Sequence, residues 1–106
     1  MSWVELIPLA RCRSDGGTFV ACKDRELAVF LLRDPTLVVV TDNACPHAGG
    51  NLSGGSVQAG VVQCPWHQWE FNLASGVCTH SPRATVRTYP AEVRNGVVWF
   101  DPGDRV

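Results

Sequence analysis

Two short segments of the chain carry side chains that bind metal ions. The first is Cys45-Pro46-His47, and the second, after sixteen intervening residues, is Cys64-Pro65-Trp66-His67. Together they supply two thiolates and two imidazoles. In one type of 2Fe-2S centre two histidines replace two of the four cysteines that usually hold an iron–sulfur cluster. Tetrahedral zinc also accepts two cysteines and two histidines, but the C-x-H spacing is not that of common zinc modules. The spacing therefore predicts a metal centre and favours iron and sulfide over zinc.

The residues around these segments resemble the Rieske domain. The resemblance is carried by residues 45–55, residues 62–72 and Ser75-Gly76, and the flanking strands extend it more loosely over nearly the whole chain. Two related groups compete: stand-alone Rieske-type ferredoxins that feed bacterial oxygenases, and the small subunit of NAD(P)H-dependent nitrite reductase. Ala28-Val29-Phe30, Gly76-Val77-Cys78 and Tyr89-Pro90 are closer to the second group.

The resemblance implies an all-β Rieske fold in which a small cluster-binding subdomain is inserted into an antiparallel barrel or sandwich base. Residues 1–106 would form a single domain, and the subdomain would span about 43–83. It also implies one 2Fe-2S cluster, with Cys45 and Cys64 on one iron and His47 and His67 on the other. These four residues are the predicted cofactor and metal ligands, and no catalytic residue is predicted.

The same resemblance predicts a low reduction potential. Imidazole ligands lower the negative charge of the centre and raise its potential from roughly −400 mV to between about −150 and +300 mV. High-potential Rieske proteins carry an extra disulfide between the ligand loops, and here Gly50 and Trp66 stand in its place. Trp69 stands where a serine normally donates a hydrogen bond to sulfide. We therefore expect a value in the lower part of the range.

Composition sets limits on compartment and partners. A net charge of −1 argues against a nucleic-acid or membrane-surface partner. The longest apolar run, Leu27 to Leu32, is far shorter than the roughly 20 residues that cross a bilayer. We expect no membrane partner and a cytoplasmic location. The three cysteines outside the ligand pair, Cys12, Cys22 and Cys78, are expected to be small buried apolar side chains in the reduced state.

Short apolar runs separated by turn residues recur along the chain and indicate an all-β protein with little or no helix. Asn95-Gly96 is a strong hairpin signal, and Asp15-Gly16-Gly17 predicts another turn. The expected strands are Val4–Leu9, Thr18–Cys22, Glu26–Leu32, Leu37–Thr41, Gly60–Gln63, Glu70–Asn72, Thr85–Tyr89, Glu92–Arg94 and Val97–Phe100.

The function implied by the resemblance is one-electron transfer from a flavin-dependent reductase to a terminal oxygenase. The alternatives are a small Rieske subunit that works with the large subunit of a nitrite reductase, and a structural zinc module. As an isolated chain the protein is not expected to be an enzyme. A Rieske oxygenase needs a second iron on two histidines and a carboxylate, and His80 is the only histidine left, expected at the surface. Trp66 and Trp69 are expected to shield the cluster, and Ser81-Pro82 to begin a covering loop.

Overall fold

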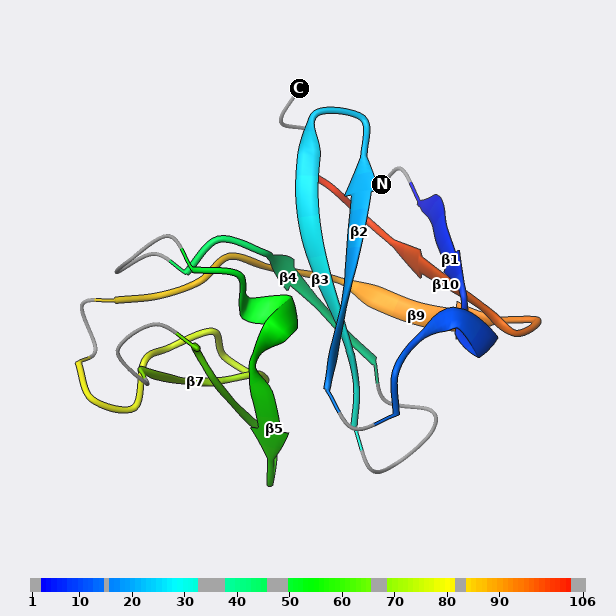
Figure 1. Ribbon diagram of the computed structural model, residues 1–106. Coiled ribbons are helices and arrows are strands. Elements are labelled where there is room, and N and C mark those ends of the chain that lie inside the picture. Colours follow the sequence, from blue (N-terminus) through cyan, green and yellow to red (C-terminus); the bar gives the residue numbers. More distant parts are fainter. Residues whose placement is uncertain are drawn as a thin grey trace.

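The described residues form ten strands in three antiparallel sheets (Figure 1). This computed structural model describes residues 3–14, 16–32, 38–45, 50–65, 69–81 and 84–103. The strands are β1 (Val4–Pro8), β2 (Gly17–Cys22), β3 (Arg25–Leu31), β4 (Val38–Asp42), β5 (Ser56–Gln58), β6 (Val61–Gln63), β7 (Glu70–Asn72), β8 (Thr88–Tyr89), β9 (Ala91–Arg94) and β10 (Val97–Phe100). Two short 3₁₀ helices, η1 (Leu9–Arg11) and η2 (Leu52–Gly54), complete the described elements. The all-β prediction is confirmed.

The central sheet, in the order β2-β3-β4-β8, separates two hydrophobic cores. Successive side chains of a strand point to opposite faces of its sheet. Leu27 and Val29 of β3 therefore enter the core shared with the β1-β10-β9 sheet, while Ala28 and Phe30 enter the core shared with the β5-β6-β7 sheet. All four side chains are fully buried. The base, which was predicted to be a barrel or sandwich, is thus a sandwich of the β2-β3-β4-β8 and β1-β10-β9 sheets. The β5-β6-β7 sheet lies on the opposite face of the central sheet.

The third sheet contains a strand that the sequence analysis missed. Strand β5 pairs with β6 through the registers Ser56↔Gln63 and Gln58↔Val61. The turn between them places Ala59 at φ 54° and Gly60 at φ 78°. Both central residues of a type I′ hairpin turn need positive φ, and Asn-Gly is the usual signal for it. Because Ala-Gly does not give that signal, the predicted strand started at Gly60 and β5 was not predicted.

The other strand boundaries in the described residues agree closely with the predicted ones, except near Thr85 and Gly17. The predicted strand Thr85–Tyr89 is shorter in the structure, where it spans Thr88–Tyr89.

The two predicted turns differ in outcome. Asn95 and Gly96 both adopt positive φ, as the hairpin signal predicts. Of the turn predicted at Asp15-Gly16-Gly17, Asp15 lies outside the described residues, and Gly17 is not a turn residue because it begins β2 and pairs with Phe30. A Cβ at Gly17 would lie 2.7 Å from the Phe30 ring and 2.8 Å from the Cα of Ser53, so glycine is needed here for close approach.

Gly55 is a second position where the backbone leaves no room for a side chain. A Cβ there would lie 2.1 Å from the carbonyl oxygen of Gln63, on the neighbouring strand β6. At the preceding residue, Gly54, a Cβ would meet nothing within 4 Å. The two adjacent glycines therefore form a matched pair for substitution.

We predict that Gly55→Ala destabilises the folded protein by about 1–3 kcal/mol or more, since the clash is with backbone that cannot rotate away. Gly54→Ala should change stability by no more than about 0.5 kcal/mol. The midpoint of thermal unfolding, followed by circular dichroism at equal cofactor loading, measures both. Equal midpoints for the two variants would contradict the close approach of the Gly55 backbone to Gln63 of β6.

Candidate metal centre

Two loops of equal length carry the cysteines of the predicted metal centre. In the first loop the Cys45 N–H donates to the Gly50 carbonyl at 2.7 Å, and in the second the Cys64 N–H donates to the Trp69 carbonyl at 2.6 Å. In both loops the closing bond joins a cysteine to the fifth residue after it. The backbone therefore gives the two cysteines equivalent places, each at the start of a closed six-residue loop.

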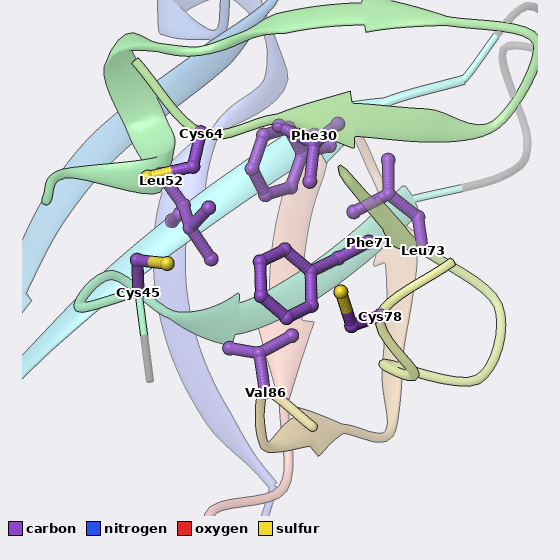
Figure 2. Packing of buried hydrophobic residues seen from close by; sticks show 10 residues of the cluster. Phe30, Cys45, Leu52, Cys64, Phe71, Leu73, Cys78 and Val86 are labelled. Atoms are coloured by element: carbon purple, nitrogen blue, oxygen red, sulfur yellow. The ribbon is translucent and has the colours of Figure 1, made fainter. Parts of the chain in front are cut away.

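Both cysteine side chains belong to the core between the central sheet and the third sheet. Cys45 is 2% exposed and Cys64 is fully buried. Figure 2 shows them on the same side of the packed residues, with Leu52 between them and Cys78 on the far side of Phe71. All five cysteines of the chain lie within the described residues, and all five are free. Two unbridged thiols at paired loops supply two of the four ligands that the predicted iron–sulfur centre needs.

The first loop is held at its base by Asn43, which follows β4. The Asn43 N–H donates to the Glu26 carbonyl at 2.9 Å, and its own carbonyl accepts from the Leu52 N–H at 2.8 Å. Its side-chain Oδ1 accepts from the Ser53 N–H at 2.9 Å, and its Nδ2 donates to Asn51 Oδ1 at 3.0 Å. The sequence analysis missed this residue, because an asparagine between a strand and a loop carries no signal that separates it from an ordinary turn residue.

The second loop lies between β6 and β7, whose nearest paired residues are Gln63 and Glu70. Trp69 is half-buried and packs against the core that contains the two cysteines, and the expected shielding of the cluster stays a prediction. His80 is exposed, as predicted, and its Nε2 lies 3.9 Å from Glu70 Oε1.

The described residues contain only part of the predicted site. Cys45 and Cys64 come together in one core, whereas His47 and His67 lie outside the described residues, as do Pro46, Trp66 and Pro82. Within the described ranges no group of three or more cysteine, histidine or acidic side chains is arranged to hold a metal ion. The complete ligand set therefore stays a prediction.

Of the three remaining cysteines, which were expected to be buried, only Cys78 is fully in a core. Cys78 is 3% exposed and belongs to the same core as the loop cysteines. Cys12 and Cys22 are half-buried against the core of the base. Burial raises the pKa of the Cys12 thiol, which lowers its thiolate fraction and hence its reactivity.

A groove of about 880 Å³ lies beside the first loop and includes Ala44 in its lining. Tyr89, the only tyrosine of the chain, also lines it. The Tyr89 hydroxyl donates to Asp42 Oδ1 and accepts from Arg25 Nη1 at 3.1 Å. The guanidinium carbons of Arg25 and Arg87 lie 5.7 and 5.0 Å from the centre of the ring. The groove also contains Asp24 and Glu26, so its lining has mixed charge.

The fold and the paired loops define an all-β protein in which two loops bring two cysteines into one core. Residues 2–90 match the family model described as Rieske [2Fe-2S] domain. The chain belongs to the Rieske family, and one 2Fe-2S cluster is the cofactor that this family implies. This finding decides for iron and sulfide against the zinc alternative.

Curated relatives include both small and large proteins. The chain is 26% identical to the ferredoxin component of the naphthalene 1,2-dioxygenase system of Pseudomonas putida, over 95% of this chain and 96% of that protein. It is 34% identical to cholesterol 7-desaturase nvd of Drosophila melanogaster over 78% of this chain. That match spans only 19% of the desaturase, so the chain corresponds to one part of it.

Solved structures of both candidate groups share the fold. A ferredoxin of Sphingomonas yanoikuyae B1 superposes with a TM-score of 0.84 at 28% identity, covering 96% of this chain and all of that one. A protein described as the small subunit of an NADH-dependent nitrite reductase from Mycobacterium tuberculosis gives the same TM-score and identity, covering 93% of both chains. In the described part of the chain no helix is long and apolar enough to cross a membrane.

We predict that Tyr89 titrates above the ordinary tyrosine pKa of about 10. Burial raises the pKa of Tyr89 first, and the hydrogen bond and negative charge of Asp42 raise it further, against the lowering effect of Arg25 and Arg87. Because the folded state holds this proton more tightly, its stabilising contribution is complete below pH 10 and is lost as the pH rises through the raised pKa.

A difference titration at 295 nm measures this pKa, with Tyr89→Phe as the blank for absorption by other groups. Asp42→Asn should move the pKa back toward its ordinary value, since it removes the negative charge and keeps an acceptor oxygen. A titration midpoint below 10 in the unsubstituted protein would contradict the hydrogen bond to Asp42.

Proposed function

We propose that this Rieske protein is a one-electron carrier that accepts electrons from a flavin-dependent reductase and passes them to a terminal oxygenase. The observation that supports it best is the match over nearly the whole length of both chains to a dioxygenase ferredoxin component. When bound, a 2Fe-2S cluster supplies reversible uptake of one electron. The protein supplies the thiol ligands, the apolar surroundings and the rigid strands that hold the loops.

The proposed ligands are Cys45 and Cys64 on one iron and His47 and His67 on the other, within a cluster-binding unit of about residues 43–83. Burial of the two thiols in one core supports the cysteine half of the set. Few water molecules can reach a thiol that is at most 2% exposed, so the sulfur ligands are protected from hydrolysis and from competing metals. Five free cysteines fit a reducing compartment, and we propose the cytoplasm.

We propose that the chain has no catalytic activity of its own. A Rieske oxygenase needs a further iron held by two histidines and a carboxylate. The chain has three histidines, and the cluster takes two of them. The third, His80, is exposed beside Glu70 and has no second histidine to complete such a site. The electron therefore has to leave the chain to be used.

A second candidate function is the small subunit of an NAD(P)H-dependent nitrite reductase. The Mycobacterium tuberculosis protein supports it, since its TM-score and identity equal those of the ferredoxin structure. Most of the sequence features that favour this group lie in the cores: Ala28 and Phe30 are fully buried, Cys78 is 3% exposed and Tyr89 is 7% exposed. The identity of a core residue is determined by packing and not by the redox partner, so these features do not separate the two groups.

Stopped-flow reduction tests the carrier function. The purified holoprotein is mixed with NADH and a flavin-dependent ferredoxin reductase, and then with an oxidised Rieske oxygenase. A carrier should take up one electron per chain and be reoxidised by the oxygenase. Stable co-purification with a nitrite reductase large subunit, without reoxidation by the oxygenase, would instead support the second candidate.

We predict that replacing any one of Cys45, Cys64, His47 or His67 by alanine abolishes binding of iron and sulfide, because a cluster held at four points loses an iron ligand. Matched controls are Cys22→Ala and His80→Ala, which change the same residue types outside the proposed ligand set. Both controls should keep two iron and two sulfide per chain in elemental and sulfide analysis. One bound zinc without sulfide in the unsubstituted protein would contradict the ligand set.

We also predict a reduction potential below about −50 mV, in the lower part of the Rieske range. The five cysteines form no disulfide that could bridge the loops, and Gly50 is a buried glycine whose carbonyl closes the first loop. Trp69 offers no hydroxyl donor to sulfide. Fewer donors to the cluster stabilise the added electron less. Protein-film voltammetry measures the potential, and a value above about +100 mV would contradict the predicted surroundings.

A further inference from the structure

We propose that Asn43 is a positioning residue for the first ligand loop, acting as a clamp whose side-chain partners are Asn51 and Ser53. The inference rests on the proposed ligand set, since it concerns how the segment that carries Cys45 and His47 is held. Asn43 lies two residues before Cys45, and its side chain acts on the loop rather than on the cluster.

All four hydrogen-bonding groups of Asn43 are used. Its backbone N–H binds strand β3 at Glu26, and its carbonyl, its Oδ1 and its Nδ2 bind Leu52, Ser53 and Asn51, three consecutive residues after the loop. One residue therefore joins both ends of residues 44–50 and fastens them to the central sheet. The bond from the Cys45 N–H to the Gly50 carbonyl closes a second, smaller ring inside the first.

Burial makes the clamp specific for asparagine. Asn43 is only 2% exposed, and a buried polar group must find partners within the protein. The side chain has to accept from the Ser53 N–H and donate to Asn51 at the same time. Aspartate could only accept, and leucine could do neither. The Ser53 N–H also lies at the start of η2, where Asn51 in the N-cap position makes no side-chain cap.

The two ligand loops differ in a way that explains why the first one needs a clamp. The second loop lies between paired strands, because Gln63 and Glu70 directly flank it in the β6–β7 ladder. The first loop leaves β4 and returns to η2, with the isolated bridge Ala44↔Asn51 across its base. A loop between strands is positioned by the ladder, whereas a loop without a returning strand needs side-chain bonds to fix its ends.

The experiment compares Asn43→Ala, Asn51→Ala, their double variant and the conservative Asn51→Asp in the holoprotein. Asn51 is exposed, so its substitution leaves no buried group behind at that position, and aspartate there can still accept from Asn43 Nδ2. The matched control is Asn72→Ala. The Asn72 Oδ1 accepts from the Ala74 N–H at 2.9 Å and the Ser75 N–H at 3.3 Å, in an exposed turn away from the clamp.

The readouts are the half-life of the visible absorption in the presence of EDTA and the g-values of the reduced cluster. Asn43→Ala should shorten the half-life roughly tenfold and shift the g-values. The reason is that the substitution leaves the hydrogen-bonding partners of the Asn43 side chain unsatisfied. Asn51→Ala should act in the same direction more weakly, and Asn51→Asp should restore the half-life of the unsubstituted protein. The double variant should lose less than the sum of the single effects, because both remove the same bond.

Asn72→Ala should lower the unfolding midpoint without changing the half-life at 25 °C or the g-values. Unchanged half-life and g-values in Asn43→Ala, or an effect of Asn51→Ala no larger than that of Asn72→Ala, would overturn the clamp. If Asn43→Ala fails to fold, the comparison of Asn51→Ala with Asn51→Asp decides. An unsubstituted protein without any cluster would contradict the ligand set, and the clamp with it, whereas a loaded protein with unaffected variants contradicts the clamp alone.

Discussion

Burial of β3 on both faces is the constraint on which the rest of the structure depends. Four consecutive residues, 27–30, are fully buried, and they alternate between the core of the base and the core that contains the two cysteines. A strand buried on both faces must be covered by other elements on each side. The β1-β10-β9 sheet covers one face, and η2 with the third sheet covers the other. The core that contains Cys45 and Cys64 is therefore built against the same strand that stabilises the base.

Sequence patterns predicted the features that depend on local chemistry. The hairpin at Asn95-Gly96 and most strands follow from turn residues and alternation. The meeting of Cys45 and Cys64 in one core was predicted only through the resemblance to the Rieske domain. Features that depend on residues far apart in the chain could not be predicted. Gly17 is required by Phe30 and Ser53, and Gly55 by Gln63, so neither glycine can be explained from its neighbours in sequence. The hydrogen bonds by which Asn43 holds the first loop could not be predicted for the same reason.

Cys45 and Cys64 have two roles that cannot be separated energetically. They are proposed ligands, and they are also buried members of a core with Leu52, Phe71 and Val86 (Figure 2). A metal site that exists only in the folded chain contributes its binding free energy to folding. Packing of this core and retention of the cofactor are therefore coupled, and substitutions at Leu52 or Phe71 should affect both even though neither side chain is a ligand.

Residues at the end of β4 make hydrogen bonds to the chain segments on both sides of that strand. The Asp42 N–H donates to the Arg87 carbonyl at 3.0 Å, and the next N–H, of Asn43, donates to Glu26 of β3 at 2.9 Å. The Asp42 side chain binds Tyr89 at the groove, while the Asn43 side chain binds the loop. The first ligand loop thus leaves from a strand in the interior of the sheet that is bonded on both sides. A loop that begins at an interior strand starts from backbone that is fixed by hydrogen bonds on both sides. A loop that began at an edge strand would start from backbone that is bonded on one side only.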